Sequence, residues 1–338
     1  MNEVEVTKVK NLWGSTEGTW RTAEWRRWLQ HPKVQERINI LVTGDAQKDR
    51  YQYFLDHYRP TRFGRRIRAK RALTLGCGHG EFERGLAKYD FAEIHEGVDI
   101  ADGAVAEATR LAKAEGLDHL RYRVADLNTI RLPECTYDVV FGISAVHHVA
   151  NLEHLFREVL LSLKPGGYFM LDEFVGPSQF QWPNEQVAII NEQLDKLPVE
   201  FKYAISHPEI IKGCVWRHTL EEMNAADPSE AIRSGEIVQL LPGYFDIVEF
   251  RGYGGTLLHL LLDEIAGHFL PEDPRGMEYL HSFFALEDQM IASGKFQHDF
   301  AFVIARRKPT RVQKVLGRTA AYAVTKTRAI LRANALRS

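Results

Sequence analysis

The sequence has few cysteines, no long apolar run and little net charge, and each absence excludes a class of protein. Three cysteines in 338 residues are too few and too scattered for a disulfide framework or a zinc site. We therefore expect a reducing, cytoplasmic environment. No apolar stretch reaches about 18 residues, and the first residues have no apolar core of a secretory signal, so neither a membrane span nor export is predicted. A formal net charge of −2 gives no global reason to expect nucleic acid.

The most informative segment is residues 71–84, where a short apolar run ends in three glycines and a helix-forming stretch follows. Gly76, Gly78 and Gly80 stand at alternate positions. A residue without Cβ lets the backbone turn sharply and approach a ligand closely. This pattern is typical of the first strand-to-helix turn of a nucleotide-binding sheet.

Further strand and helix patterns follow at the spacing of alternating βα units. Strand-like segments with polar residues at or just past their ends are residues 96–100, 120–128, 137–144 and 163–173. Helical patterns cover residues 104–115, which Gly116 should end, and residues 152–163. Such alternation predicts a mostly parallel sheet with right-handed crossovers.

Residues 1–70 precede this pattern and are predicted to form an N-terminal helical cap. Helices are expected over residues 31–39, with Pro32 near the first turn, and over residues 49–58. The segment contains four tryptophans, which are Trp13, Trp20, Trp25 and Trp28. We interpret them as side chains of a cap that packs on the sheet, and the alternative is that they form an aromatic wall of a substrate pocket. The basic run over residues 62–71 is interpreted as a solvated linker, with contact to an acidic substrate as the alternative.

Residues 176–242 form a long gap before the next strand pattern, at residues 244–251. We interpret the gap as a lid or substrate lobe inserted at the carboxyl ends of the strands, where open α/β sheets bind ligands. Helices are expected over residues 186–197, from residues 227–230 onward, and over 257–269. Residues 299–306 are predicted as the last strand of a domain that spans residues 71–306.

The C-terminal tail, residues 307–338, differs from the rest in composition. From residue 306 to the end the sequence has ten lysines or arginines and no acidic residue, with apolar residues at roughly helical spacing. A basic amphipathic helix of this kind can lie on an anionic membrane or pack on its own domain or a second subunit. Peripheral membrane contact and dimerisation through the tail both stay open.

The order and spacing of these motifs over roughly residues 70–175 resemble the class I S-adenosylmethionine-dependent methyltransferases. The resemblance implies a Rossmann-like, seven-stranded, mostly parallel sheet with an antiparallel last strand, and S-adenosyl-L-methionine as cofactor. It implies cofactor contacts from residues in four consecutive strand ends, namely Gly76, Cys77, Gly78, Gly80, Asp99, Ile100, Asp126, Leu127 and Ser144. Asp99 would bind the ribose hydroxyls, Asp126 and Leu127 would flank the adenine, and Ser144 would lie near the methionine moiety.

Two details bear on this resemblance. The family commonly has an acid two residues before the first glycine, which reaches the methionyl ammonium through water, but here that residue is Thr74. A dinucleotide site would place its third glycine at position 81, where this chain has Glu81. A carboxylate repels a pyrophosphate but is tolerated by a sulfonium, which argues for S-adenosylmethionine.

Candidate catalytic residues follow the fourth and fifth strands. His147 and His148 occupy a position that faces the transferred methyl in the fold, and histidine suits general-base work. In the family a histidine there can also simply pack under the cofactor. Glu173 and Asp172 compete as the base, or as groups that bind a substrate hydroxyl or a metal. No supporting ligand cluster is visible, so no metal is predicted.

The acceptor is predicted to be a small molecule or a glycan. Hydrogen-bonding residues alternate with aromatic ones after the fifth strand, which suits a sugar or a loop over the cofactor; they are Ser178, Gln179, Phe180, Gln181 and Trp182. Methyl transfer to oxygen is the leading hypothesis. The alternatives are a non-catalytic S-adenosylmethionine-binding scaffold, an N- or S-methyltransferase, and a nucleic-acid methyltransferase, whose Asn/Asp-Pro-Pro-Tyr/Phe motif is absent at residues 142–145.

Overall fold

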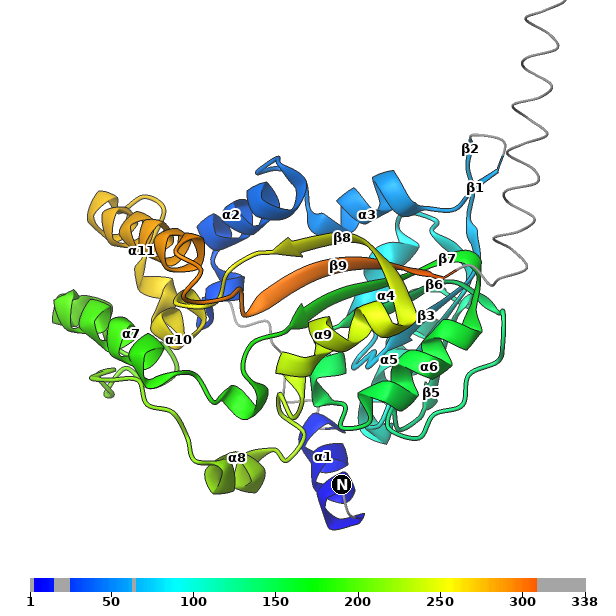
Figure 1. Cartoon of the computed structure of the whole chain (residues 1–338), viewed down its shortest axis with the longest axis horizontal. Coiled ribbons are helices and arrows are strands. Elements are labelled where there is room, and N and C mark those ends of the chain that lie inside the picture. Colours follow the sequence, from blue (N-terminus) through cyan, green and yellow to red (C-terminus); the bar gives the residue numbers. More distant parts are fainter. Residues whose placement is uncertain (1–2, 15–24, 63–64, 309–338) are drawn as a thin grey trace, which may run out of the picture.

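A seven-stranded sheet forms the centre of the computed structural model, which describes residues 3–14, 25–62 and 65–308 (Figure 1). The strand order is β5-β4-β3-β6-β7-β9-β8. Strands β3 to β7 are parallel to one another, whereas β9 is antiparallel to both β7 and β8. The predicted Rossmann-like sheet with an antiparallel last strand is confirmed. Its strands are β3 (Ala69–Leu75), β4 (Ala92–Asp99), β5 (Leu120–Val124), β6 (Tyr137–Ile143), β7 (Leu163–Phe174), β8 (Phe245–Gly252) and β9 (Phe300–Arg307).

Two apolar clusters cover the two faces of the sheet, because successive side chains of a strand point to opposite sides. In β6, Val139 and Phe141 belong to one cluster and Val140 to the other. Both faces of this strand are therefore buried, as is typical of a parallel strand. The Val140 side is covered by α6 (Leu152–Ser162) and α9 (Ser234–Tyr244). Beside β4 and the edge strand β5 lie α4 (Glu81–Ala87) and α5 (Asp102–Ala114), and α5 ends just before Glu115 and Gly116, as predicted.

The opposite face is covered by helices that precede the sheet in the sequence (Figure 1). These are α2 (Pro32–Thr43) and α3 (Arg50–Tyr58), which contribute Val34, Ile38 and Phe54 to the core. Asp49 caps α3 by accepting the N–H of Tyr51 at 2.7 Å. Both helices expected in this segment form. They are preceded by α1 (Glu3–Gly14) and the 3₁₀ turn η1 (Trp28–Gln30), in which Trp28 is buried.

The basic run before β3 is largely neutralised by its own neighbours. Arg68 pairs with Asp90 at 3.0 Å, and Arg71 pairs with Glu96. Arg66, in the short hairpin of β1 (Thr61–Arg62) and β2 (Arg65–Arg66), lies 3.3 Å from Asp56. These contacts favour the linker interpretation over an anion site.

The insertion after β7 forms a separate group of short elements. It contains η3 (Ser178–Phe180), α7 (Asn184–Lys196), η4 (Val199–Phe201) and α8 (Leu220–Ala226). Between β8 and β9 lie α10 (Leu258–Leu262), η5 (Ala266–His268) and α11 (Pro274–Ala292). Figure 1 shows α7, α10 and α11 gathered beyond one end of the sheet, on the side away from β5.

Two predicted helices are wrong. Residues 257–269 do not form one helix, because α10 ends at Leu262 and the chain turns at Glu264, whose φ is +63°. No helix begins at residues 227–230: Asp227 accepts the N–H of Ser229 at 2.8 Å and stabilises a turn. Ala231 then adopts a left-handed φ of +50°, which delays the helix until Ser234.

The predictions on membrane spans and on the C-terminal tail have different outcomes. No helix in the described part of the chain has the length and apolar content needed to span a bilayer. The basic tail lies outside the described residues apart from its first two positions, and so does Trp20. Membrane contact and dimerisation through the tail stay predictions.

Candidate active site and cofactor site

The glycine loop directly follows β3 and has the geometry that glycine alone adopts easily. Gly76, Gly78 and Gly80 have φ values of +66°, +49° and +72°. A Cβ on Gly76 would lie 2.3 Å from the Cβ of Ala145, at the end of β6. The loop is thus a narrow backbone cradle between two strand ends, with the N-terminus of α4 behind it.

Replacement of Gly76 by alanine is therefore expected to destabilise the protein by about 1–3 kcal/mol and to abolish cofactor binding. The added methyl would force the loop and the end of β6 apart. Thermal unfolding and calorimetric titration with S-adenosylmethionine would measure both effects. Gly85→Ala is the control, because nothing lies within 4 Å of a Cβ at this position in α4. Equal behaviour of the two variants would contradict the cradle geometry.

Asp99 ends β4 and faces the glycine loop. Its Oδ2 accepts the N–H of Gly78 at 2.9 Å and its Oδ1 accepts the N–H of Ala101 at 2.9 Å. Each carboxylate oxygen keeps a second lone pair. The side chain can hold the loop and still accept hydrogen bonds from two vicinal hydroxyls, as a ribose would offer. Ile100 follows Asp99 and is half-buried at the same carboxyl end of β4.

The next two strand ends complete this edge of the sheet. After β5, Oδ1 of Asp126 accepts the backbone and side-chain amide protons of Asn128 at 2.8 and 2.9 Å, and Leu127 packs into the core. After β6, Ser144 is exposed and has a left-handed φ of +48°. The structure thus brings every sequence-predicted cofactor residue to the carboxyl edge of β3 to β6. A glycine cradle with acids at the next two strand ends fits a cationic adenosine cofactor.

Glu173 lies at the end of β7, fully buried, and all of its hydrogen bonds are made within the protein. Its Oε1 accepts the N–H groups of Ala145 and Val146 at 2.7 and 2.6 Å. Its Oε2 lies 2.7 Å from Nδ1 of His147. The prediction of Glu173 as a free base is therefore wrong, because the carboxylate is committed to η2 (Val146–His148). It is a positioning residue that orients the histidine.

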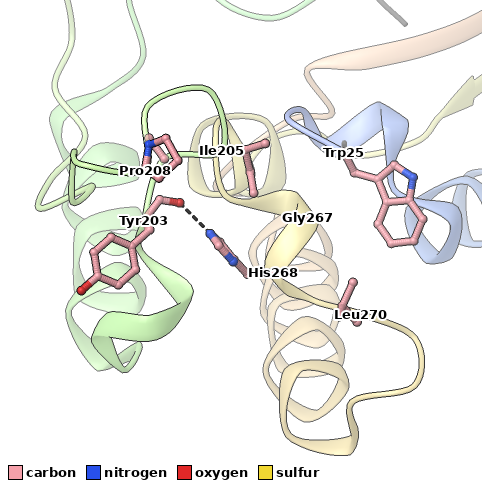
Figure 2. A pocket seen from close by; sticks show the side chains of 8 residues that line it. Trp25, Tyr203, Ile205, Pro208, Gly267, His268 and Leu270 are labelled. Carbon is pink, nitrogen blue, oxygen red and sulfur yellow. Dashed lines mark hydrogen bonds between the residues drawn. The ribbon is translucent and has the colours of Figure 1, made fainter. Parts of the chain in front are cut away.

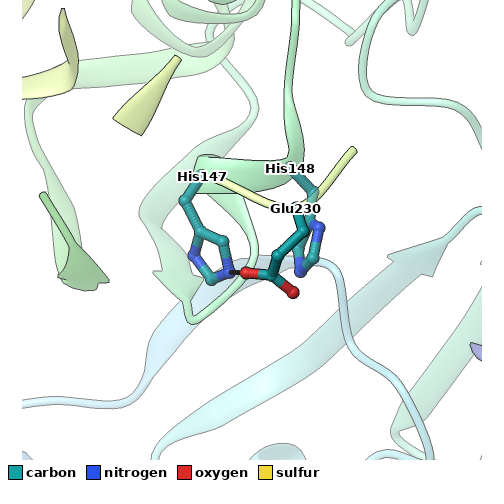
Figure 3. A group of neighbouring side chains, drawn as sticks. All are labelled: His147, His148 and Glu230. Carbon is teal, nitrogen blue, oxygen red and sulfur yellow. Dashed lines mark ion pairs between the residues drawn. The ribbon is translucent and has the colours of Figure 1, made fainter. Parts of the chain in front are cut away.

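His147 is the better placed of the two candidate bases. Since Nδ1 donates to Glu173, the neutral ring keeps its lone pair on Nε2, which lies 3.6 Å from Oε1 of Glu230 (Figure 3). Burial acts to lower the pKa of His147, but the charge and hydrogen bond of Glu173 outweigh it, and the pKa is raised above 6.5. The pKa of Glu230 is raised by its burial, although His147 opposes this.

His148 belongs to a second chain of hydrogen bonds beside the first. Its Nδ1 lies 3.1 Å from Oγ of Ser229, whose hydroxyl donates to Asp227 at 2.7 Å. The indole of Trp13 donates to the same carboxylate at 3.1 Å, and its ring contacts His148 edge-on at 5.2 Å. Burial and the neighbouring His147 lower the pKa of His148 well below its usual value. His148 is therefore a weaker base than His147.

Sequence reasoning missed three residues of this site, namely Asp227, Ser229 and Glu230, and it named Trp13 only in the alternative of an aromatic pocket wall. The only signal was the acidic turn at residues 227–230 inside the predicted lid. The ground for expecting no metal was also wrong, because a cluster does exist. Potential ligand atoms of His147, His148 and Glu230 all lie within 4.8 Å of one another (Figure 3).

Asp172 is held in a buried network of hydrogen bonds, which argues against the predicted alternative that it binds a substrate. Its Oδ2 accepts hydrogen bonds from Arg50 Nε and the Tyr51 hydroxyl, both at 2.6 Å, and its Oδ1 accepts the Tyr253 hydroxyl at 2.5 Å. The group is only 3% exposed. The adjacent carboxylates of Asp172 and Glu173 therefore have different partners, because they point to opposite faces of the sheet.

The predicted sugar-binding loop after β7 is used differently from the expectation. Gln181 donates to the carbonyls of Gln179 and His218, and Gln179 donates to Asn224 at 3.0 Å. These amides connect segments of the insertion to one another. The aromatic members do lie beside the site: Phe180 stacks on Trp182 at 4.9 Å, and Phe174 contacts both Phe180 and His147.

A separate hollow lies within the lobe formed by the insertion and the segment after β8 (Figure 2). Trp25, Ile205 and Leu270 line it, and Nε2 of His268 donates a hydrogen bond to the carbonyl of Tyr203 at 2.6 Å. None of the predicted catalytic or cofactor residues lines this hollow. Trp25 therefore faces a different part of the molecule from His147 and Glu230.

The strand order, the glycine cradle and the acids at consecutive strand ends define a methyltransferase of the Rossmann-like type. Residues 73–171 match the family model described as a methyltransferase domain. Residues 73–171 therefore form a methyltransferase domain of the class I S-adenosylmethionine-dependent type, whose cofactor is S-adenosylmethionine.

Three named relatives show how far the similarity reaches. Sterol 24-C-methyltransferase erg6 of Aspergillus fumigatus is 32% identical over 127 residues, which are 37% of this chain and 32% of that enzyme. Sterol 24-C-methyltransferase ERG6A of Gibberella zeae is 25% identical over 77% of this chain and 69% of its own length. The 27-O-demethylrifamycin SV methyltransferase of Amycolatopsis mediterranei is 24% identical over 54% of this chain and 71% of its own length. The match thus covers under a third of the Aspergillus enzyme.

Proposed function

We propose that this protein transfers a methyl group from S-adenosylmethionine to a hydroxyl oxygen of a small-molecule or glycan acceptor. The observation that carries the proposal is the buried Glu173–His147 pair, which leaves Nε2 of a histidine with raised pKa facing Glu230. An oriented histidine is the group that a hydroxyl acceptor needs, because its proton must leave as the new bond forms. The name of the rifamycin relative supports oxygen as the acceptor atom.

The chain's own residues would act as follows. The glycine loop and Asp99 would hold S-adenosylmethionine, which would supply a methyl activated by its sulfonium; the S–CH₃ bond would break as the O–CH₃ bond forms, with S-adenosylhomocysteine as the leaving group. His147 Nε2 takes the hydroxyl proton. Glu173 holds the tautomer and stabilises the imidazolium, while Glu230 receives a hydrogen bond from the newly protonated Nε2. The aromatic rings of Phe174 and Phe180 exclude water beside the reacting atoms.

The pH dependence of this reaction follows from the raised pKa of His147. The base must be neutral, so kcat/KM is expected to rise with pH through a pKa above 6.5 and then to level off. Glu173→Gln removes the charge that raises this pKa. The pH profile of kcat/KM for this variant should shift to lower pH, and its maximal rate should fall. A profile unchanged by the substitution would show that His147 is not the titrating group.

The proposal is tested by incubating the purified chain with methyl-labelled S-adenosylmethionine and panels of glycosides, phenols and sterols. Mass spectrometry of the product then identifies the methylated atom. An O-methyl product supports the proposal. A C-methyl product, as the names of the two sterol relatives imply for those enzymes, would overturn it. The same assays with a chelator separate base from metal catalysis, because loss of activity on metal removal would assign His147, His148 and Glu230 to a cation.

A further inference from the structure

Glu83, in the first turn of α4, is a fully buried carboxylate without the hydrogen bonds that such a group normally makes. Its side chain is 0% exposed. The Thr74 hydroxyl and the helix backbone favour its charged form, yet neither carboxylate oxygen makes a hydrogen bond of normal geometry among the described residues. Buried acids are otherwise paired or hydrogen-bonded. A buried carboxylate of this kind needs a partner that the described residues do not supply.

The position of Glu83 places it directly behind the cofactor cradle. Gly80 is the N-cap of α4, so Glu83 follows the last glycine of the loop by three residues. The titratable groups whose charges act on it or respond to it come from every surrounding element: Cys77, Arg84, Asp99 and Tyr122. Arg84 is the only cation among them, and its guanidinium pairs with Glu115 and the His79 carbonyl instead.

The other carboxylate of the cradle is already engaged. Asp99 holds the N–H groups of Gly78 and Ala101. Thr74, which stands beside Glu83 at the end of β3, is uncharged, and its hydroxyl is 2.9 Å from Nε2 of His95. Burial lowers the pKa of that histidine to about 3, so it contributes no positive charge. The cradle therefore contains one carboxylate without a partner, and that is Glu83.

We propose that Glu83 is the anionic partner of the α-ammonium group of the cofactor's methionine portion, and that it takes the place that Thr74 leaves without an acid. An ammonium brings three hydrogen-bond donors and a full positive charge, which match the two free carboxylate oxygens. The inference rests on the cofactor assignment and is independent of the acceptor. Burial raises the pKa of Glu83 to about 7, so binding of the cation would be coupled to release of a proton near neutral pH.

The test compares three ligands by calorimetric titration of the wild type and Glu83→Gln at pH 8. S-adenosylmethionine and S-adenosylhomocysteine both carry the ammonium, whereas 5′-methylthioadenosine lacks it. We expect both amino-acid-bearing ligands to bind about 10- to 100-fold more weakly to the variant, the range for a charge-assisted hydrogen bond, and methylthioadenosine to bind equally. Loss confined to S-adenosylmethionine would assign Glu83 to the sulfonium and overturn the proposal. Equal affinities of the wild type and the variant for all three ligands would also overturn the proposal.

Two controls separate binding from folding. Glu81→Gln removes an exposed carboxylate from the same helical turn and should change no affinity. The melting temperature of ligand-free Glu83→Gln at pH 8 should equal or exceed that of the wild type, because the substitution removes a buried charge. Wild-type affinity for S-adenosylmethionine should also fall as pH drops below about 7, whereas the affinity of Glu83→Gln should stay flat. A flat wild-type profile would contradict the proposed contact.

Discussion

Replacement of His147 by glutamine is expected to lower kcat by about 10²- to 10⁴-fold, the contribution of a positioned general base. The amide can still occupy the space and accept from its surroundings, but it cannot take a proton. The Kd of S-adenosylmethionine should stay within about twofold, since His147 is not among the predicted cofactor residues at the ends of β3 to β6. Single-turnover assays at saturating cofactor, together with calorimetric titration, would measure the two quantities separately.

His148→Gln is the matched control for this prediction. The side chain is adjacent, similarly placed and held by Ser229, but its pKa lies well below the usual value and suits it poorly as a base. A much smaller loss of kcat is expected than for His147→Gln. If the two variants lose equal activity, the pair acts as a unit. If His147→Gln keeps most of the activity, the acceptor needs no base, and proximity alone drives the transfer.

Replacement of Asp172 by alanine is expected to destabilise the fold by about 3–5 kcal/mol, which is the cost of removing one partner of a buried ion pair. Arg50 would be left uncompensated within the core, since its side chain is 10% exposed and lies 2.6 Å from the Asp172 carboxylate. Tyr51 and Tyr253 would lose the acceptor of their hydroxyls. Chemical denaturation monitored by tryptophan fluorescence would measure the change.

Asp56→Ala provides the comparison for Asp172→Ala, because Asp56 lies on the same helix as Arg50 and pairs with Lys48 at 2.8 Å in a more exposed setting. Its loss should cost no more than about 1 kcal/mol. Similar destabilisation by the two substitutions would show that the Arg50–Asp172 pair is not the buried anchor that its geometry indicates. Glu173→Gln should instead impair kcat more than stability, which would separate the roles of these adjacent acids.

Much of the fold was predictable because strands and helices produce characteristic local patterns of apolar residues in the sequence. Buried strands such as residues 137–143 are short apolar runs, and α5 repeats its apolar residues at helical spacing before a glycine stop. Sequence patterns failed where single residues redirected the chain. The left-handed φ values of Glu264 and Ala231 interrupt stretches that look helical, and neither residue is a glycine that would have signalled a break.

The sequence by itself placed the predicted cofactor residues at one edge of the sheet, because alternating βα units bring the ends of the parallel strands together. Strand order puts Gly76, Asp99, Asp126 and Ser144 at that edge, and their cofactor contacts are what the resemblance to the methyltransferases implies. The tertiary structure decided the rest. His148 meets Ser229, which is 81 positions away, and the Trp13 indole meets Asp227 across 214 positions. No local periodicity records contacts of this kind, because they depend on how the insertion and α1 fold back over the sheet. The same holds for the commitment of Glu173 to His147 and for the unpartnered burial of Glu83: each follows from which groups share a buried volume.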